Sequence, residues 1–331
     1  MTTYGIAMFP QPPADLKALC ELVESGPFDQ VWIPDERFHR DLGVDLTLAA
    51  LNTTRARIGS SVTDPYVRHP ALTASLMATV DEVSGGRLVV GIGAGASGFK
   101  QMGVTQEKPQ LAIREMVALM RRLWTGENVD FDGKTTSFHG SLDYTPARPD
   151  IPIWIAGRGP HVLQLAGEVA DGAMIGALSS APTLAYALGR IQQGLVKGGR
   201  PDRPFKRAIW MHVAVHEDGA LAREAVRIVV AGALVSSLSV LTELGVDLPT
   251  DLLARLQGVP YGINDPEMLR AAATIPDEVL SHFSVAGSPD EVRARFAELA
   301  HLGIDHFAIL PWPSAGQTMA QLIAAIARVV G

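Results

Sequence analysis

Two adjacent carboxylates, Asp35 and Glu36, follow an apolar run at residues 30–34. Two neighbouring acids repel each other, and partial burial raises the pKa of one of them, so that a proton donor is available near neutral pH. An exposed, solvated pair in a loop is the alternative interpretation. The sequence therefore marks these two residues as candidates for acid–base chemistry.

A second candidate is the glycine-rich segment at residues 93–98 (GAGASG), which matches the pattern G-x-G-x-x-G. A dinucleotide-binding loop would use such glycines to approach a pyrophosphate, with Glu115 at about the right offset for the ribose. Against this, three strand–helix units precede the motif, and Gly103 and Pro109 interrupt the helix that should follow it. A tight turn and a close approach of a planar cofactor ring to the backbone are the other interpretations.

A third candidate is the segment at residues 156–160 (AGRGP), between an expected strand and an expected helix. Free backbone N–H groups at a helix N-terminus favour an anion, and glycines let the chain wrap around it. Arg158 could add a charge-assisted hydrogen bond, although a solvent-facing side chain is an alternative. The segment is therefore a candidate anion site.

The histidines and the cysteine do not predict a metal site. Cys20 is the only cysteine and lies in an apolar helical pattern, which places it in the core. His212 and His216 are four apart in an expected strand, but no third ligand stands out. Trp210 and Trp312 lie at or near strand ends, where they either line a cleft or pack in the core.

The composition excludes several classes of protein. The chain has 331 residues, of which 47% are hydrophobic and 19% charged, enough apolar material for a large core. The formal net charge of -7 and the lack of a basic stripe argue against nucleic-acid binding. We recognise neither a signal peptide nor a membrane span, so we expect a cytoplasmic enzyme that acts on a small molecule.

Short apolar runs alternate with helical patterns along the whole chain, and the candidate residues lie where the runs end. The expected strands are residues 4–9, 30–34, 57–62, 87–92, 153–156, 172–175, 208–216 and 306–310. The expected helices between them are residues 14–24, 46–54, 70–83, 111–124, 161–169 and 183–196. Such a pattern fits a closed barrel or an open doubly wound sheet. The even repeat favours a (β/α)8 TIM barrel forming a single domain, residues 1–331, with insertions at 126–150 and 217–280.

Seven segments follow one another in a recognisable order along nearly the whole chain. They are residues 28–35 (FDQVWIPD), 59–70 (GSSVTDPYVRHP), 86–95 (GRLVVGIGAG), 123–127 (LWTGE), 152–160 (PIWIAGRGP), 170–173 (ADGA) and 285–291 (VAGSPDE). In these segments the chain resembles the bacterial luciferase-like superfamily, and within it the deazaflavin (coenzyme F420) oxidoreductases such as methylenetetrahydromethanopterin reductase. The resemblance implies a barrel that transfers a hydride between reduced F420 and an organic substrate.

The resemblance also implies roles for particular residues. Asp35 would lie beside the cofactor ring, with its neighbour Glu36 near the reacting face, and our hypothesis is that Glu36 or a neighbouring residue handles the proton. The bond between Ser61 and Val62 would be a cis peptide bond in a bulge behind the ring. The implied cofactor contacts are Asp35, Ser61, Val62, Thr63, Gly93, Ala94, Gly95, Ala156, Gly157, Arg158, Gly159 and Pro160.

The chain departs from parts of this family. Its sugar-phosphate dehydrogenases carry a histidine where Glu36 stands and a carboxylate where Ala96 stands, so glucose 6-phosphate is not the expected substrate. An FMN-dependent monooxygenase that works with a separate reductase is the alternative. The luciferase branch carries an arginine for the FMN phosphate near the glycines of the fourth strand, and Ala94 occupies that neighbourhood here, which favours deazaflavin. A barrel that binds deazaflavin or a partner without catalysis is a third hypothesis. The family tends to dimerise through outer helices, so we expect a homodimer.

Overall fold

The molecule is built around eight parallel strands that form a closed ring. The computed structural model describes residues 2–9, 12–95, 98–245, 248, 250–256 and 266–331. The ring consists of β1 (Thr3–Ala7), β2 (Gln30–Ile33), β3 (Arg57–Ser60), β4 (Leu88–Ile92), β7 (Ile153–Gly157), β8 (Gly172–Gly176), β9 (Lys206–Val215) and β11 (His306–Pro311). Pairing of β9 with both β8 and β11, and of β11 with β1, closes it. The expected (β/α)8 TIM barrel is confirmed.

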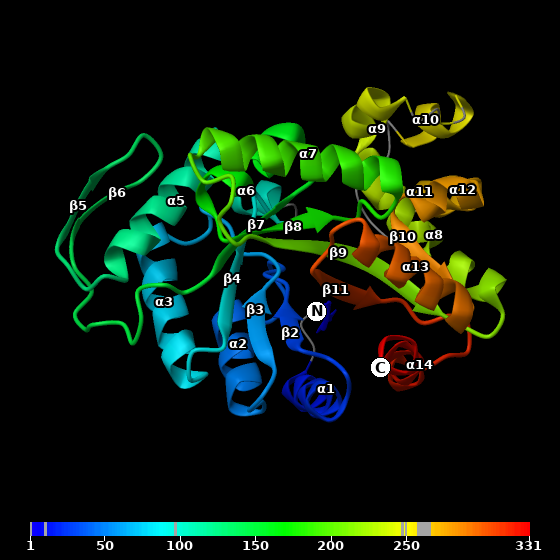
Figure 1. Ribbon diagram of the computed structural model, residues 1–331, viewed down its shortest axis with the longest axis horizontal. Coiled ribbons are helices and arrows are strands. Elements are labelled where there is room, and N and C mark those ends of the chain that lie inside the picture. Colours follow the sequence, from blue (N-terminus) through cyan, green and yellow to red (C-terminus); the bar gives the residue numbers. More distant parts are fainter. Residues whose placement is uncertain (1, 10–11, 96–97, 246–247, 249, 257–265) are drawn as a thin grey trace.

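Helices surround this barrel (Figure 1). The longer ones are α1 (Pro13–Ser25), α2 (Leu42–Leu51), α3 (Pro70–Val83), α5 (Pro109–Leu123), α6 (Pro160–Val169), α7 (Ala181–Lys197), α8 (Gly219–Val235), α13 (Pro289–His301) and α14 (Met319–Val330). Several begin with proline, whose fixed φ and missing N–H suit the first helical turn. Helix α2 begins four residues before the expected position because the carboxylate of Asp41 accepts hydrogen bonds from the N–H groups of Gly43 and Val44.

The two expected insertions have different structures. Residues 126–150 contain an antiparallel hairpin of β5 (Val129–Asp132) and β6 (Ser137–Gly140), at the left of Figure 1. The described part of residues 217–280 is mostly helical, as expected, and includes α9 (Leu238–Leu244), α10 (Thr250–Leu256), α11 (Pro266–Ala272) and the start of α12 (Asp277–Ser281). A further strand, β10 (Ser284–Gly287), pairs with β9 beyond the end of β8. Neither the hairpin nor β10 was predicted from the sequence.

Side chains fill the inside of the barrel. The interior cluster consists of Ala7, Trp32, Val89, Trp154, Met174, Ala208, Ala308 and Leu310, with Phe9, Val62, Ala156, Trp210 and Trp312 packed against it. The rings of Trp32 and Trp154 lie 5.3 Å apart. A packed barrel leaves its chemistry to the strand ends, where catalytic residues of this fold are found. No described helix is long and apolar enough to cross a membrane.

Candidate active site

The predicted site residues lie at the carboxyl ends of neighbouring barrel strands. Asp35 follows β2, Thr63 follows β3 and Gly93 follows β4. Backbone hydrogen bonds continue past these ends, because the Ser61 N–H donates to the Ile33 carbonyl at 2.8 Å and the Gly93 N–H donates to the Thr63 carbonyl at 2.9 Å. The three segments are therefore brought side by side at one end of the barrel.

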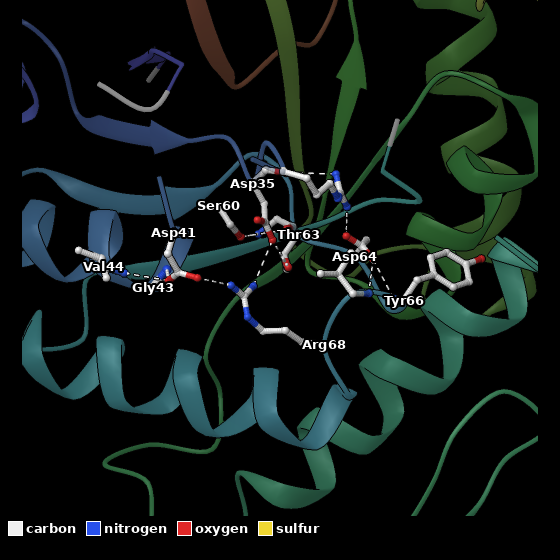
Figure 2. A network of polar contacts seen from close by, with 12 residues as sticks. Asp35, Asp41, Gly43, Val44, Ser60, Thr63, Asp64, Tyr66 and Arg68 are labelled. Carbon is white, nitrogen blue, oxygen red and sulfur yellow. Dashed lines mark hydrogen bonds and ion pairs between the residues drawn. The ribbon is translucent and has the colours of Figure 1, made fainter. Parts of the chain in front are cut away.

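Asp35 is held by two donors at this end of the barrel (Figure 2). The Thr63 hydroxyl donates to Asp35 Oδ2 at 2.9 Å, and Arg68 Nη1 lies 3.3 Å from the same oxygen. Arg68 Nη2 reaches Asp41 Oδ2 at 2.7 Å, so that the guanidinium bridges two carboxylates. The other Asp35 oxygen, Oδ1, has no hydrogen-bond partner among the described residues. One oxygen is thus fixed and the other remains available to a ligand.

Burial raises the pKa of Asp35 above its ordinary value, although Thr63 and Arg68 act in the opposite direction. A buried carboxyl group with a raised pKa can hold a proton closer to neutral pH than an exposed one. Glu36 is partly buried and begins the turn that follows Asp35, in which the His39 N–H donates to the Glu36 carbonyl at 3.2 Å. The structure therefore defines the surroundings of Asp35, and the proton-donor role of Glu36 stays a prediction.

An ion pair between Arg37 and Asp64 supports this site, and sequence reasoning missed it. The two side chains form a hydrogen-bonded pair and are 7% and 0% exposed. Arg37 also lies over the ring of Phe99, 4.4 Å from its centroid, and Asp64 accepts hydrogen bonds from the Tyr66 and Val67 N–H groups. The pair ties the loop after β2 to the loop after β3 and to α4 (Phe99–Met102).

Glycines at the end of β4 permit a close approach to β3. A Cβ atom on Gly91 would lie 2.1 Å from the Ser60 carbonyl oxygen, and one on Gly93 would lie 2.7 Å from Val62 Cγ2. The bond between Ser61 and Val62 is cis, as the resemblance implied, and Ser61 Oγ is buried without a partner among the described residues. The ends of β3 and β4 are therefore packed closely through glycines, and the residue after β3 carries a hydroxyl group without a partner among the described residues.

The dinucleotide interpretation of residues 93–98 is wrong. The segment follows the fourth strand of a barrel rather than the first strand of a doubly wound sheet. Glu115, the proposed ribose ligand, accepts hydrogen bonds from the N–H groups of Lys134 and Thr135, both at 2.8 Å, and so holds the turn between β5 and β6. Ala96, which marked a departure from the family pattern, lies outside the described residues.

The segment at residues 156–160 joins the end of β7 to the start of α6. Gly159 precedes the helix without a side-chain cap, so the first N–H groups of α6 have no side-chain acceptor there. Arg158 does not extend into solvent, because its Nη1 donates to the Ala233 carbonyl at 3.1 Å and to the hydroxyls of Ser236 and Ser237 at 3.0 and 2.9 Å. The arginine binds the C-terminal end of α8, and its predicted contact with an anion stays a prediction.

Two hollows elsewhere on the molecule contain none of these residues. One, of about 310 Å³, lies between the β9–α8 loop and helices α13 and α14, and the other, of about 240 Å³, lies between α8, α12, β10 and α13. Neither is lined by a residue predicted for the site. The convergence of side chains at the strand ends locates the candidate site.

The sequence model of the luciferase-like monooxygenase family matches residues 1–306, which include every barrel strand except the last. The chain belongs to the luciferase-like monooxygenase family. Membership agrees with the barrel and with the order of the seven segments along the chain. It confirms the resemblance that the sequence predicted.

Several relatives in this family are similar over most of their length. The 5,10-methylenetetrahydromethanopterin reductase of Archaeoglobus fulgidus is 36% identical over 292 residues, which cover 88% of this chain and 87% of that protein. The F420-dependent glucose-6-phosphate dehydrogenase of Kineococcus radiotolerans is 30% identical over 314 residues, or 89% of this chain and 86% of that one. The solved structure of the coenzyme F420-dependent tetrahydromethanopterin reductase of Methanopyrus kandleri has a TM-score of 0.86 at 28% identity, covering 99% of this chain and 97% of that chain. The expected likeness to F420-dependent enzymes is confirmed.

Proposed function

We propose that the protein is an F420-dependent oxidoreductase that transfers a hydride between the deazaflavin ring and an organic substrate. The observation that carries the proposal is the partly buried Asp35 carboxyl group, held by Thr63 and Arg68 beside the glycines at the end of β4. The similarity to enzymes that use F420 supports the choice of cofactor. The substrate is expected to be a small organic molecule.

The residues at the strand ends fit a bound deazaflavin. Ser61 offers a buried hydroxyl group without a partner among the described residues, which suits a polar edge of a ring. Gly93 carries no side chain, which lets Val62 pack against the end of β4 beside Ser61. The uncapped start of α6 offers N–H groups and a helix dipole to a phosphate. When bound, the deazaflavin would carry two electrons as a hydride and would react little with oxygen.

The chain's own residues would orient the reactants and hold a proton. Thr63 and Arg68 fix Asp35 Oδ2, so that Oδ1 is presented in one direction with little loss of conformational freedom. Because burial raises the pKa of Asp35, its protonated form, which can donate a hydrogen bond, is easier to reach than in an exposed aspartate. The adjacent Glu36 is the proposed proton donor to the substrate. Arg37 and Asp64 hold the loop that carries both acids.

Fluorescence titration of the purified protein with F420 and with FMN tests the cofactor. We expect F420 to bind in the micromolar range and FMN to bind weakly or not at all. Micromolar binding of FMN alone would replace the proposal with a flavin-dependent monooxygenase. If basic side chains such as Arg158 contact the acidic tail of F420, the affinity for F420 falls with added salt, and a flat salt response would reject that contact.

Turnover of a Glu36→Gln variant tests the proton donor. The amide keeps the size of the side chain but cannot donate a proton as an acid, so we expect turnover to fall by about a hundredfold or more with little change in F420 affinity. Glu82→Gln, at an exposed residue of α3, is the matched control and should behave as the wild type. Unchanged turnover of the Glu36 variant would remove that residue from the chemistry and leave Asp35 as the proposed acid.

A further inference from the structure

Two histidines are buried inside the barrel, and they differ in their hydrogen bonding. His306 has partners on both ring nitrogens, since Trp32 Nε1 donates to its Nε2 at 2.9 Å and its Nδ1 lies 2.8 Å from the Thr3 hydroxyl. It is 2% exposed and serves as a satisfied core residue. His212 is 7% exposed and has a partner on only one ring nitrogen within the described part of the chain. This difference sets His212 apart.

The hydrogen bond to His212 determines which ring nitrogen carries the proton. The indole Nε1 of Trp312 can only donate, and it lies 2.9 Å from His212 Nδ1. Nδ1 is therefore the acceptor, and the neutral imidazole must carry its hydrogen on Nε2. Burial, with a smaller effect from the nearby Arg158 charge, lowers the pKa of His212 to about 3. The ring is accordingly an uncharged donor with a defined orientation.

A second unpaired donor lies beside it. Trp210 is two residues earlier on β9, and its ring centroid is 5.5 Å from that of His212. The Trp210 Nε1 atom is buried and has no acceptor among the described residues. Buried donors are nearly always hydrogen-bonded in folded proteins, to protein atoms, to water or to a ligand. Two adjacent ring N–H groups without acceptors among the described residues are candidates for hydrogen bonds to a ligand.

Both donors lie at the end of the barrel that carries the candidate site. Alternate residues of a strand share a face, and Ala208 and Trp210 contribute to the interior cluster, so His212 also points inward. His212 pairs with Leu310, next to the end of β11, and lies beyond the last residue of β8. The carboxyl ends of these parallel strands are the same end at which Asp35 and Gly93 are found.

We propose that His212 Nε2 and Trp210 Nε1 donate hydrogen bonds to an uncharged acceptor on the substrate, a carbonyl or imine group. Trp312 is the positioning residue that fixes the His212 tautomer. Two neutral donors match a neutral acceptor, whereas carboxylates and phosphates are better matched by charged donors. The contact binds and orients the group, and His212 transfers no proton. The assignment of this group as the substrate rests on the proposed function.

Nitrogen-15 NMR of histidine-labelled protein tests the tautomer without any cofactor. We expect His212 to be protonated on Nε2 alone and to remain so from about pH 5 to about pH 8. His139 is the internal reference, because hydrogen bonding to Asp130 raises its pKa and its signals should respond to pH. A His212 ring protonated on Nδ1, or one that titrates in this range, would overturn the proposal.

Binding of N-cyclohexylformamide tests the acceptor, because its carbonyl accepts hydrogen bonds and resists hydride addition. We expect it to shift the His212 Nε2–H signal, with F420 present or absent, while cyclohexanecarboxylate leaves the signal in place. His212→Phe and Trp210→Phe should each weaken formamide binding by about fivefold to tenfold. His212→Gln, which keeps a donor, should retain most of the affinity, and Trp312→Phe should change the ratio of tautomers.

The two-donor site would be refuted by a His212 signal that the formamide does not shift. It would also be refuted by equal formamide affinity in the wild type, His212→Phe and Trp210→Phe. A shift caused by the carboxylate and not by the formamide would also refute it. F420 titration of the same variants separates the two proposals. Failure of the wild type to bind F420 overturns the proposed function, whereas the formamide result alone decides whether these donors bind a carbonyl group.

Discussion

Replacement of Gly93 by alanine probes the contact between the ends of β3 and β4. The new methyl group would lie 2.7 Å from Val62 Cγ2 and 3.5 Å from the Ala156 carbonyl oxygen. The first distance is about 1 Å shorter than a normal carbon–carbon contact of roughly 3.5–4.0 Å. Val62 cannot retreat easily, because the N–H groups of its neighbours Ser61 and Thr63 donate to the carbonyls of Ile33 and Gly91.

Overpacking of this kind costs about 1–3 kcal/mol, so Gly93→Ala should lower the free energy of unfolding in urea by that amount. It should also weaken F420 binding, since the methyl group enters the glycine-lined segment. Gly189→Ala, on α7 with no atom within 4 Å of the added Cβ, is the matched control. It should leave binding unchanged and stabilise the protein by about 0.5–1 kcal/mol.

A double-mutant cycle identifies the cause of the destabilisation. Val62→Ala removes the methyl group that collides with the new side chain. The double variant Val62→Ala with Gly93→Ala should therefore lose less free energy of unfolding than the sum of the two single losses, by at least about 1 kcal/mol. Additive effects would refute the proposed clash. Unchanged F420 affinity in Gly93→Ala would refute the use of this segment by the cofactor.

Urea unfolding and light scattering test residues in other parts of the molecule. Because burial raises the pKa of Asp35, folding favours its protonated form, and the wild type loses stability as this group ionises. Asp35→Asn lacks this loss, so it should gain stability relative to the wild type as the pH rises from about 4 to about 8, measured by urea unfolding at each pH. A constant difference between the two proteins would contradict this. Arg148 makes two 2.8 Å hydrogen bonds to the buried Asp81. Arg148→Ala should therefore lower the free energy of unfolding by about 3 kcal/mol in the same assay. A loss below about 1 kcal/mol would show that this ion pair contributes little to stability. We propose that the exposed Leu51 and Leu72, on the contacting helices α2 and α3, form part of a homodimer interface. Light scattering should find a dimer, and the double variant Leu51→Glu with Leu72→Glu should be a monomer. A monomeric wild type would exclude this interface.

The barrel was predictable because each strand is a short apolar run with turn residues at its ends. Buried parallel strands need no polar face, so the runs stand out against the helical patterns between them. The position of Asp35 after β2 and of Gly93 after β4 followed from the same pattern, since strand ends converge in this fold. The β5–β6 hairpin and β10 were missed because each strand has four residues and β5–β6 is half exposed, which leaves no clear apolar signal.

The contacts that complete the site were not predictable from local sequence. Arg37 and Asp64 are 27 residues apart, and Trp312 and His212 are 100 residues apart. No periodicity relates such positions, because the closure of the barrel brings them together. The strand-like run around His212 was recognised, but its tautomer depends on an indole N–H supplied by the far end of the chain. The weak start of α2 was likewise decided by the Asp41 cap rather than by apolar periodicity.

A crystal structure of the protein with F420 bound tests directly where the cofactor binds. We expect a deazaflavin ring at the carboxyl ends of β2, β3 and β4, in contact with the backbone at residues 61–63 and with Gly93. One face of the ring should be left open toward Asp35 and His212. A ring bound elsewhere, or strand ends so filled by side chains that a tricyclic ring has no room, would contradict it.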